Sequence, residues 1–254
     1  MTQNVENILL GHVPSRRKSV LDQIVNQKIK SIVKLLDPSH IPFLEKYHPD
    51  LSHNQYFSEG GGSVELSFEN GLVVGFQSNE YLSSIMLNLI QNKDGSLVLN
   101  TKAIEERKKE HGVPDPIPVH AGDTRYSERR FLDFIGKRVK SIGVIKRKIH
   151  EIDSGFYPYE RAVVLHFNDC EGLFISCNLG SVCDLPTIHT ADQIHSGRLE
   201  GYKEYDYHEI EEWYPPNDEV TPTEWDWKFW RPQVYYEGIQ LNIGTDGNRC
   251  QQLF

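Results

Sequence analysis

The chain repeats itself, and this internal duplication is the feature that most constrains its fold. Residues 21–32, LDQIVNQKIKSI, match residues 132–142, LDFIGKRVKSI, with one gap. Farther along, residues 63–79 match residues 162–178, with hydrophobic positions aligned. Two matches in the same order are improbable by chance. We therefore expect two related modules in this chain of 254 residues.

The two copies together indicate the local structure that each module adopts. Taken alone, residues 20–36 fit an amphipathic helix, because apolar residues recur at helical spacing. The second copy, however, has Gly136 where the first has Val25 or Asn26, and both glycine and asparagine accept a left-handed turn. A short helix, a turn and then a strand fit both copies.

A β-hairpin is predicted in the later part of each module. Residues 64–71, VELSFENG, and residues 163–172, VVLHFNDCEG, alternate apolar and polar side chains before a turn rich in Asn, Asp and Gly. Each copy then resumes with a second apolar run, as expected for a returning strand. Residues 78–92 fit either a helix or a strand.

The remaining segments complete the prediction of an α+β fold. Thr101 can cap and Gly112 can end a helix between the modules, and a hairpin is expected at residues 234–254. We predict two strand-rich modules joined by this helix. Residues 1–113 would hold the first module and the helix, and residues 125–254 the second module, an acidic aromatic segment and the C-terminal hairpin.

The net charge of the protein is concentrated in residues 200–226. This segment has ten carboxylates and one cation, Lys203, so it carries −9, the formal charge of the whole chain, while the other residues carry 26 basic and 26 acidic side chains. All four tryptophans lie in it or beside it, and the segment also holds four tyrosines. Disordered acidic tails are poor in aromatic residues, so we expect this segment to be ordered.

An ordered acidic surface with Tyr and Trp is typical of a contact for a basic protein partner, because carboxylates steer the encounter and aromatic rings anchor it. The alternative is that the rings pack inward beneath a solvated acidic rim. The predicted partner-binding residues are Tyr202, Tyr205, Tyr207, Glu209, Glu211, Glu212, Trp213, Asp218, Glu219, Trp225, Asp226 and Trp227. A competing contact surface is the insertion at residues 37–60, which only the first copy has and which carries His40, Tyr47, His48, Tyr56 and Phe57.

No motif in the sequence predicts catalysis, a metal or another cofactor. The nucleophile pattern G-x-S-x-G is missing, and the histidines and cysteines show no paired metal-ligand spacing. We therefore expect a protein that is not an enzyme. The alternative is a carbohydrate-active or other hydrolase that uses Glu211, Glu212 or Asp226, with tryptophans stacked on sugar rings.

The composition favours a soluble, cytoplasmic protein. Residues 1–20 show no signal-peptide pattern, and no apolar stretch approaches the ~20 residues of a membrane span. The four cysteines are scattered, as is usual in a reducing compartment. With 27 basic and 36 acidic residues, the chain lacks the basic balance of a nucleic-acid binder. We expect neither a membrane nor a nucleic acid as partner.

The motifs LDFIGKRVKSI and ERAVVLHFNDCEGLFISCNLG resemble the immunity proteins of bacterial polymorphic toxin systems, which include contact-dependent, type VI secretion and Rhs systems. The first copy, VELSFENGLVVGFQSNEYLSSI, resembles the same element. The resemblance covers about residues 60–90 and 130–185, and departs from the usual Asp-Gly turn at residues 169–172. It implies a non-catalytic antidote that binds the catalytic domain of a secreted toxin. We expect a basic, nuclease-type toxin acting in the cytoplasm, and a scaffold or adaptor as the remaining alternative.

Overall fold

The computed structural model describes most of both predicted modules. The described residues are 13–79, 84–96, 115–147, 159–169, 171–177, 186–194 and 199–212. All of them except Asp115 belong to one structural unit, formed by Gly11–Leu99 and Pro116–Asp218. The predicted connecting helix, the C-terminal hairpin and residues 213–226 of the acidic segment lie outside the described residues.

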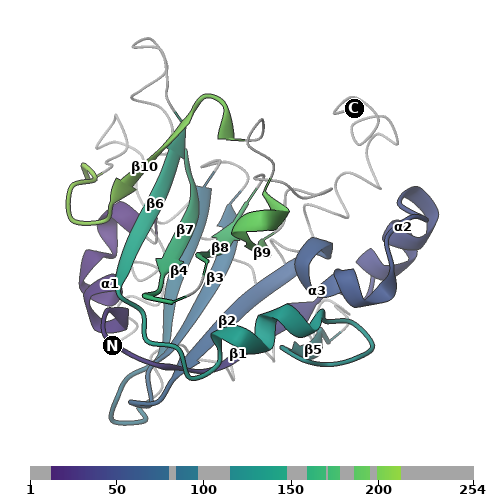
Figure 1. Cartoon of the computed structure of the whole chain (residues 1–254), viewed down its shortest axis with the longest axis horizontal. Helices are drawn as coiled ribbons and strands as arrows, with labels where there is room; N and C mark the ends of the chain where they lie inside the picture. Colours follow the sequence, from purple (N-terminus) through teal and green to yellow (C-terminus); the bar gives the residue numbers. More distant parts are fainter. Residues whose placement is uncertain are drawn as a thin grey trace, which may run out of the picture. The chain divides into compact units, whose positions relative to one another are not determined.

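The described strands form two five-stranded antiparallel sheets (Figure 1). The first sheet has the order β4-β3-β2-β1-β5. Its strands are β1 (Ile29–Leu36), β2 (Gly62–Phe68), β3 (Val73–Asn79), β4 (Ser84–Gln91) and β5 (Ile117–His120). Residues 78–92, which the sequence left open between helix and strand, thus contain the strand β4.

The second sheet repeats this connectivity, with the order β10-β6-β7-β8-β9. Its strands are β6 (Ser141–Arg147), β7 (Glu160–His166), β8 (Leu173–Ser176), β9 (Thr187–Thr190) and β10 (Tyr202–Asp206). In both sheets the first four strands follow one another as a meander, and the fifth pairs with the first. The prediction of an α+β fold with two similar modules is confirmed.

Short helices connect and flank these strands. They are η2 (Pro14–Arg16), α1 (Lys18–Ile24), α2 (His40–Tyr47), η3 (His53–Gln55), α3 (Tyr56–Glu59), η4 (Arg129–Phe134) and η5 (Ala191–Gln193). Helix α1 precedes β1, and η4 precedes β6, so both copies have the predicted order of helix, turn and strand. The insertion at residues 37–60 holds α2, η3 and α3.

The strand registers agree between the copies along β1 and β6 as far as Ile145, where the second copy has a bulge. Ile32 of β1 lies opposite Leu66 of β2, and the aligned Ile142 of β6 lies opposite Leu165 of β7. The hairpins that follow agree as well, since Leu66 pairs with Val74 and Leu165 with Leu173. A one-residue shift would turn every side chain to the other face, so this agreement means that the same positions face the core in both copies.

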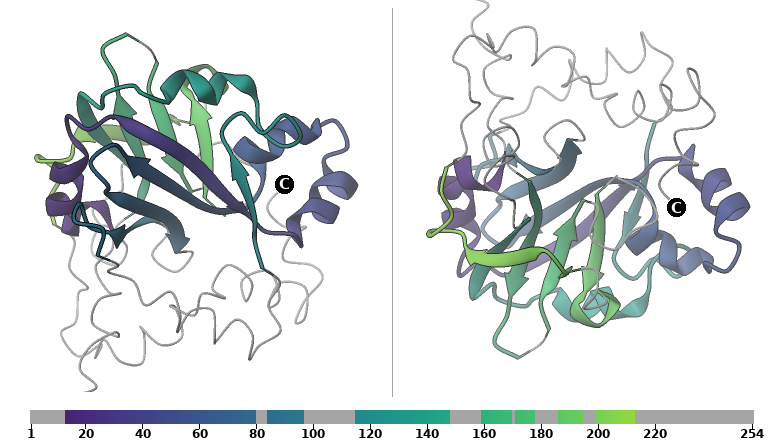
Figure 2. Two further views of the ribbon diagram at one scale, coloured as in Figure 1. Left: turned by 90° about the horizontal axis from the view of Figure 1, so that it is seen from below. Right: turned by 90° about the horizontal axis from the view of Figure 1, so that it is seen from above.

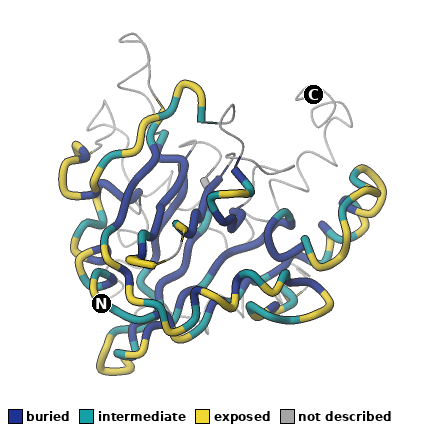
Figure 3. Tube along the Cα trace, in the orientation of Figure 1, coloured by how far each residue is buried: buried dark blue, intermediate teal, exposed yellow. Residues whose placement is uncertain are grey.

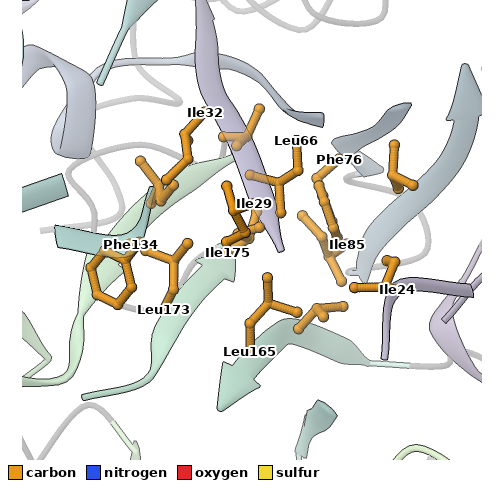
Figure 4. Packing of buried hydrophobic residues seen from close by; sticks show 14 of the residues in the cluster. Ile24, Ile29, Ile32, Leu66, Phe76, Ile85, Phe134, Leu165, Leu173 and Ile175 are labelled. Atoms are coloured by element: carbon orange, nitrogen blue, oxygen red, sulfur yellow. The ribbon is translucent and has the colours of Figure 1, made fainter. Parts of the chain in front are cut away.

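The inward faces of both sheets contribute to one hydrophobic core (Figure 4). Core residues that approach one another in this view are Ile29, Ile32, Leu66, Phe76, Ile85, Leu165, Leu173 and Ile175. The opposite face of the second sheet carries a smaller cluster that includes Ile145, Ala162, Val164 and Phe174. Strand β7 is therefore apolar on both faces and appears buried along its length in Figure 3.

Backbone hydrogen bonds join the two copies at equivalent positions, around an isolated antiparallel bridge between Lys28 and Arg138. The four bonds form two pairs. Within each pair, one bond is the equivalent of the other, with the roles of the two copies exchanged. The pairs are Asn26 N to Val139 O (2.8 Å) with Gly136 N to Ile29 O (2.7 Å), and Val139 N to Gln27 O (2.9 Å) with Ile29 N to Lys137 O (3.0 Å). The duplicated segments thus meet around a local pseudo-twofold axis.

The left-handed turn predicted from the copies is present in both. Asn26 has a φ of 65° and Gly136 a φ of 79°. Each of these residues donates its N–H to the other copy, so the turn conformation positions the hydrogen bonds that join the modules.

Replacing Gly136 by alanine should lower the free energy of unfolding by about 1 kcal/mol, because a side chain disfavours the left-handed region. No atom lies within 4 Å of the added Cβ, so the cost comes from the backbone alone. Gly136→Asn is the matched control, because asparagine already occupies the equivalent position, and should cost less. Urea unfolding measures both variants, and an equal change in the two would contradict this account.

Candidate partner-binding surface

Strand β10 forms one edge of the second sheet, and the acidic segment begins on it. It pairs with β6 from Tyr202, opposite Arg147, to Asp206, opposite Gly143. No other strand in the described part of the chain pairs with it. Charged side chains on an edge strand oppose uncontrolled pairing with other chains. The sequence YKEYD is therefore suited to an edge that stays in water.

The carboxylates of the described part of the acidic segment are exposed. These side chains are Glu200, Glu204, Asp206, Glu209, Glu211 and Glu212. Lys203 is the one lysine or arginine among residues 200–212, so the formal charge of this stretch is −5. Figure 3 shows β10 and the turn after it mostly in the colours of exposed and half-buried residues. We call residues 200–212 the acidic edge.

One tyrosine of the acidic edge points inward. Tyr207 is 4% exposed, and its hydroxyl donates a 2.7 Å hydrogen bond to Asp22 Oδ1 on α1. Burial and the neighbouring Asp22 carboxylate raise the pKa of Tyr207 well above its ordinary value. Lys18 Nζ, also on α1, donates to the carbonyl of His208 at 3.1 Å. Tyr207 is thus no surface anchor, but it fixes the acidic turn on a helix of the first module.

The other two tyrosines are half-buried on opposite faces of the sheet. Tyr205 packs against the shared core, and Tyr202 packs against the smaller cluster. The ammonium of Lys203 lies 4.5 Å from the ring centroid of Tyr205. Each ring packs against one face of the sheet, and part of each remains accessible. The acidic edge therefore combines inward packing with a charged rim.

Glu204 makes a specific contact across the outer face of the second sheet. Its Oε1 lies 2.5 Å from Nε2 of His166 on β7, and this contact raises the pKa of His166. The carboxylate crosses over Gly143 of β6, where a Cβ would come within 1.9 Å of it. Gly143 is therefore the residue that lets the side chain of Glu204 reach His166.

Six of the predicted partner-binding residues lie outside the described residues. They are Trp213, Asp218, Glu219, Trp225, Asp226 and Trp227. Their part in a partner surface stays a prediction. Of the six that the structure describes, Glu209, Glu211 and Glu212 are exposed.

The competing surface, the insertion, is buried mainly near its two ends and is mostly exposed in its middle. Tyr56 and Phe57 are 1% and 0% exposed and belong to the shared core, and His40 is also buried. Tyr47 is 54% exposed, and its ring lies tilted against that of Phe43, with 4.9 Å between ring centroids. The accessible part of the insertion thus extends from the second half of α2 to η3, and Figures 1 and 2 place α2 away from β10, on the other side of this unit.

A buried polar group anchors the insertion, and no sequence motif indicates it. His40 Nδ1 accepts a 3.0 Å hydrogen bond from Gly61 N, and Gly61 O accepts one from Asp37 N. Lys34, fully buried on β1, donates to the carbonyl of Pro186 at 2.9 Å. Burial, and then the charge of Lys34, lower the pKa of His40 to about 4. His40 is therefore a neutral hydrogen-bond acceptor inside the fold.

The described ranges hold neither a cluster of metal-ligating side chains nor a membrane-spanning helix. They contain no group of three or more His, Cys, Asp or Glu side chains placed to hold a metal ion. Cys177, the cysteine that the structure describes, is a buried thiol whose sulfur accepts a 3.8 Å hydrogen bond from Nη1 of Arg161. No helix in these ranges has the length and apolar character needed to span a bilayer.

Comparison with protein-family models, with curated proteins and with solved structures found no match to this chain. Functional inference therefore depends on the described surface and on the sequence motifs.

Neutral His40 should make folding stability depend on pH. Between pH 6.5 and about 4 the unfolded chain binds a proton at His40 that the folded protein excludes, so this stabilisation is present above pH 6.5 and lost as the pH falls toward 4. Since one pKa unit corresponds to about 1.4 kcal/mol, the loss should reach roughly 3 kcal/mol.

Urea unfolding of the wild type and of His40→Gln at several pH values isolates this contribution. Asp37, whose pKa burial raises, acts in the opposite direction, but it is present in both proteins and largely cancels in the difference. A difference between the two proteins that stays constant from pH 7 to pH 4 would contradict the role assigned to His40.

Proposed function

We propose that this protein is an immunity protein that binds and neutralises a cognate bacterial toxin through the acidic edge. The supporting observation is the fixed position of its exposed carboxylates: they project from a paired strand and from a turn held on α1 by Tyr207. The resemblance of the duplicated motifs to immunity proteins supplies the class of partner.

Electrostatic complementarity supports a basic partner. The acidic edge has a formal charge of −5, whereas outside residues 200–226 the basic and acidic residues of the chain are equal in number. A local field of one sign accelerates association with a surface of the opposite sign and disfavours partners of like charge. The acidic edge is thus suited to direct a partner to one place on the protein.

A toxin that cleaves nucleic acid fits this surface chemically. Its active-site cleft must attract phosphates, so it carries basic residues, and carboxylates can occupy the positions of those phosphates. We infer that the protein blocks such a cleft in the cytoplasm. A scaffold or adaptor would use the same surface for a basic partner that is not a toxin.

Co-expression with the toxin domain encoded by a neighbouring gene tests this function. The protein should restore growth that the toxin alone suppresses, and the two should co-purify. Absence of a neighbouring toxin, or binding without protection, would favour an adaptor. Turnover of a glycan substrate that is lost in Glu211→Gln or Glu212→Gln would instead favour the hydrolase alternative.

Reversing Glu209, Glu211 and Glu212 to lysine should slow association with the toxin about tenfold at low salt, because steering charges act mainly on the association rate. The effect should shrink as salt is added, since the screening length falls from about 10 Å at 0.1 M to about 3 Å at 1 M. Tyr47→Ala on α2 is the control and should leave both rate constants unchanged. Stopped-flow kinetics that show the reverse ranking would place the interface on the insertion.

A further inference from the structure

The backbone of β10 directs alternate hydrogen-bonding groups away from the sheet. Tyr207 N donates to Ile142 O of β6. Narrow and wide pairs alternate in antiparallel sheets, so Tyr205 and Lys203 are the next residues whose backbone groups bond to β6. The N–H groups of Tyr202, Glu204 and Asp206 therefore point toward the outer edge. No described residue accepts a hydrogen bond from them.

Strand β5, which is the equivalent of β10 in the first copy, differs from it at one position whose backbone nitrogen points outward. Ala121 N donates to Ile32 O, as Tyr207 N does to Ile142 O, so β5 has the same phase relative to β1. In this register Pro118, opposite Leu35, is equivalent to Glu204, opposite Ile145. Proline has no N–H, and on an edge strand its nitrogen faces outward. Pro118 thus blocks strand addition at β5, whereas Glu204 leaves the corresponding donor in place at β10.

We propose that the outer edge of β10 binds its partner by strand addition, receiving an extended basic segment that continues the second sheet. This inference rests on the proposed function in one respect, namely that the partner is a toxin. Main-chain hydrogen bonds to Tyr202 and Glu204 would supply affinity, and side chains on the two faces of the added strand would supply specificity.

The two faces of β10 define the side chains that the added segment needs. Tyr202, Glu204 and Asp206 lie on the outer face of the sheet, and Lys203 and Tyr205 on the face toward the core. Cross-strand neighbours of opposite charge stabilise a pair of strands, and those of like charge destabilise it. The segment should therefore carry Lys or Arg at alternate positions, over the carboxylates, with apolar residues between them against the ring of Tyr205.

A proline substitution separates main-chain binding from charge. Glu204→Pro removes the outward N–H and keeps the pairing with β6, as Pro118 does in β5. Glu204→Ala is the matched control, since it removes the same carboxylate and the contact with His166 but retains the N–H. The probe is a library of ten-residue peptides with Lys or Arg at alternate positions and varied apolar residues between them. Against the peptides that bind the full-length wild type, Glu204→Pro should bind at least tenfold more weakly than Glu204→Ala.

Two further measurements apply even if Glu204→Pro does not fold. N-methylation of each peptide residue in turn should abolish binding at every second position and be tolerated between them, because alternate N–H groups face β10 in a strand pair. Amide hydrogen exchange of the wild type should slow at Glu204 when the peptide is bound.

The inference is overturned if no peptide of the library binds, if Glu204→Pro binds as tightly as Glu204→Ala, or if N-methylation shows no alternation. These outcomes do not involve the toxin. Failure to neutralise a toxin would therefore contradict the proposed function and leave this binding mode in place. Failure to bind the peptides would contradict this binding mode and leave the proposed function in place.

Discussion

The backbone pairing between Asn26–Ile29 and Gly136–Val139 is the constraint on which the rest of the structure depends. It places equivalent positions of the two copies next to each other, and the strands that start there, β1 and β6, lead into two sheets that share one core. The acidic edge is a consequence of this arrangement. Its strand belongs to the second copy, but the helix that holds its turn, through Asp22 and Lys18, belongs to the first. A surface built in this way requires both copies to be folded.

The two copies differ both on the inner face of the first sheet and at the edge strands of the two sheets. On the inner face, Lys34 stands at the position of Val144, and its buried ammonium is satisfied by the carbonyl of Pro186. This polar contact joins the first copy to the second, near the insertion that only the first copy has. On the edge, Pro118 stands at the position of Glu204. One copy has thus acquired an insertion and a closed edge, and the other an acidic edge with its N–H groups intact.

The parts of the fold that the sequence predicted are those with short-range causes. The turns at Asn26 and Gly136 and the two hairpins follow from residue types a few positions apart, and comparison of the copies resolved the ambiguity of residues 20–36. Strand β4 could not be assigned because Ser84 and Asn88 are buried beside apolar neighbours, which removes the alternation that identifies a strand. The inward position of Tyr207 depends on Asp22, which is 185 residues away in the chain, so no local pattern contains it. The buried His40 and Lys34 look like ordinary surface residues in the sequence.

The same carboxylates also explain how an open edge can be kept without self-association. An unprotected edge strand pairs readily with any extended chain, including another copy of itself. Two acidic edges brought together would each carry a formal charge of −5, and like charges on adjacent strands destabilise their pairing. A basic segment meets no such repulsion and gains the same main-chain hydrogen bonds. Charge therefore selects the partner of β10, because the backbone of an edge strand has no sequence preference of its own. The first copy lacks this concentration of charge, and Pro118 protects its edge strand instead.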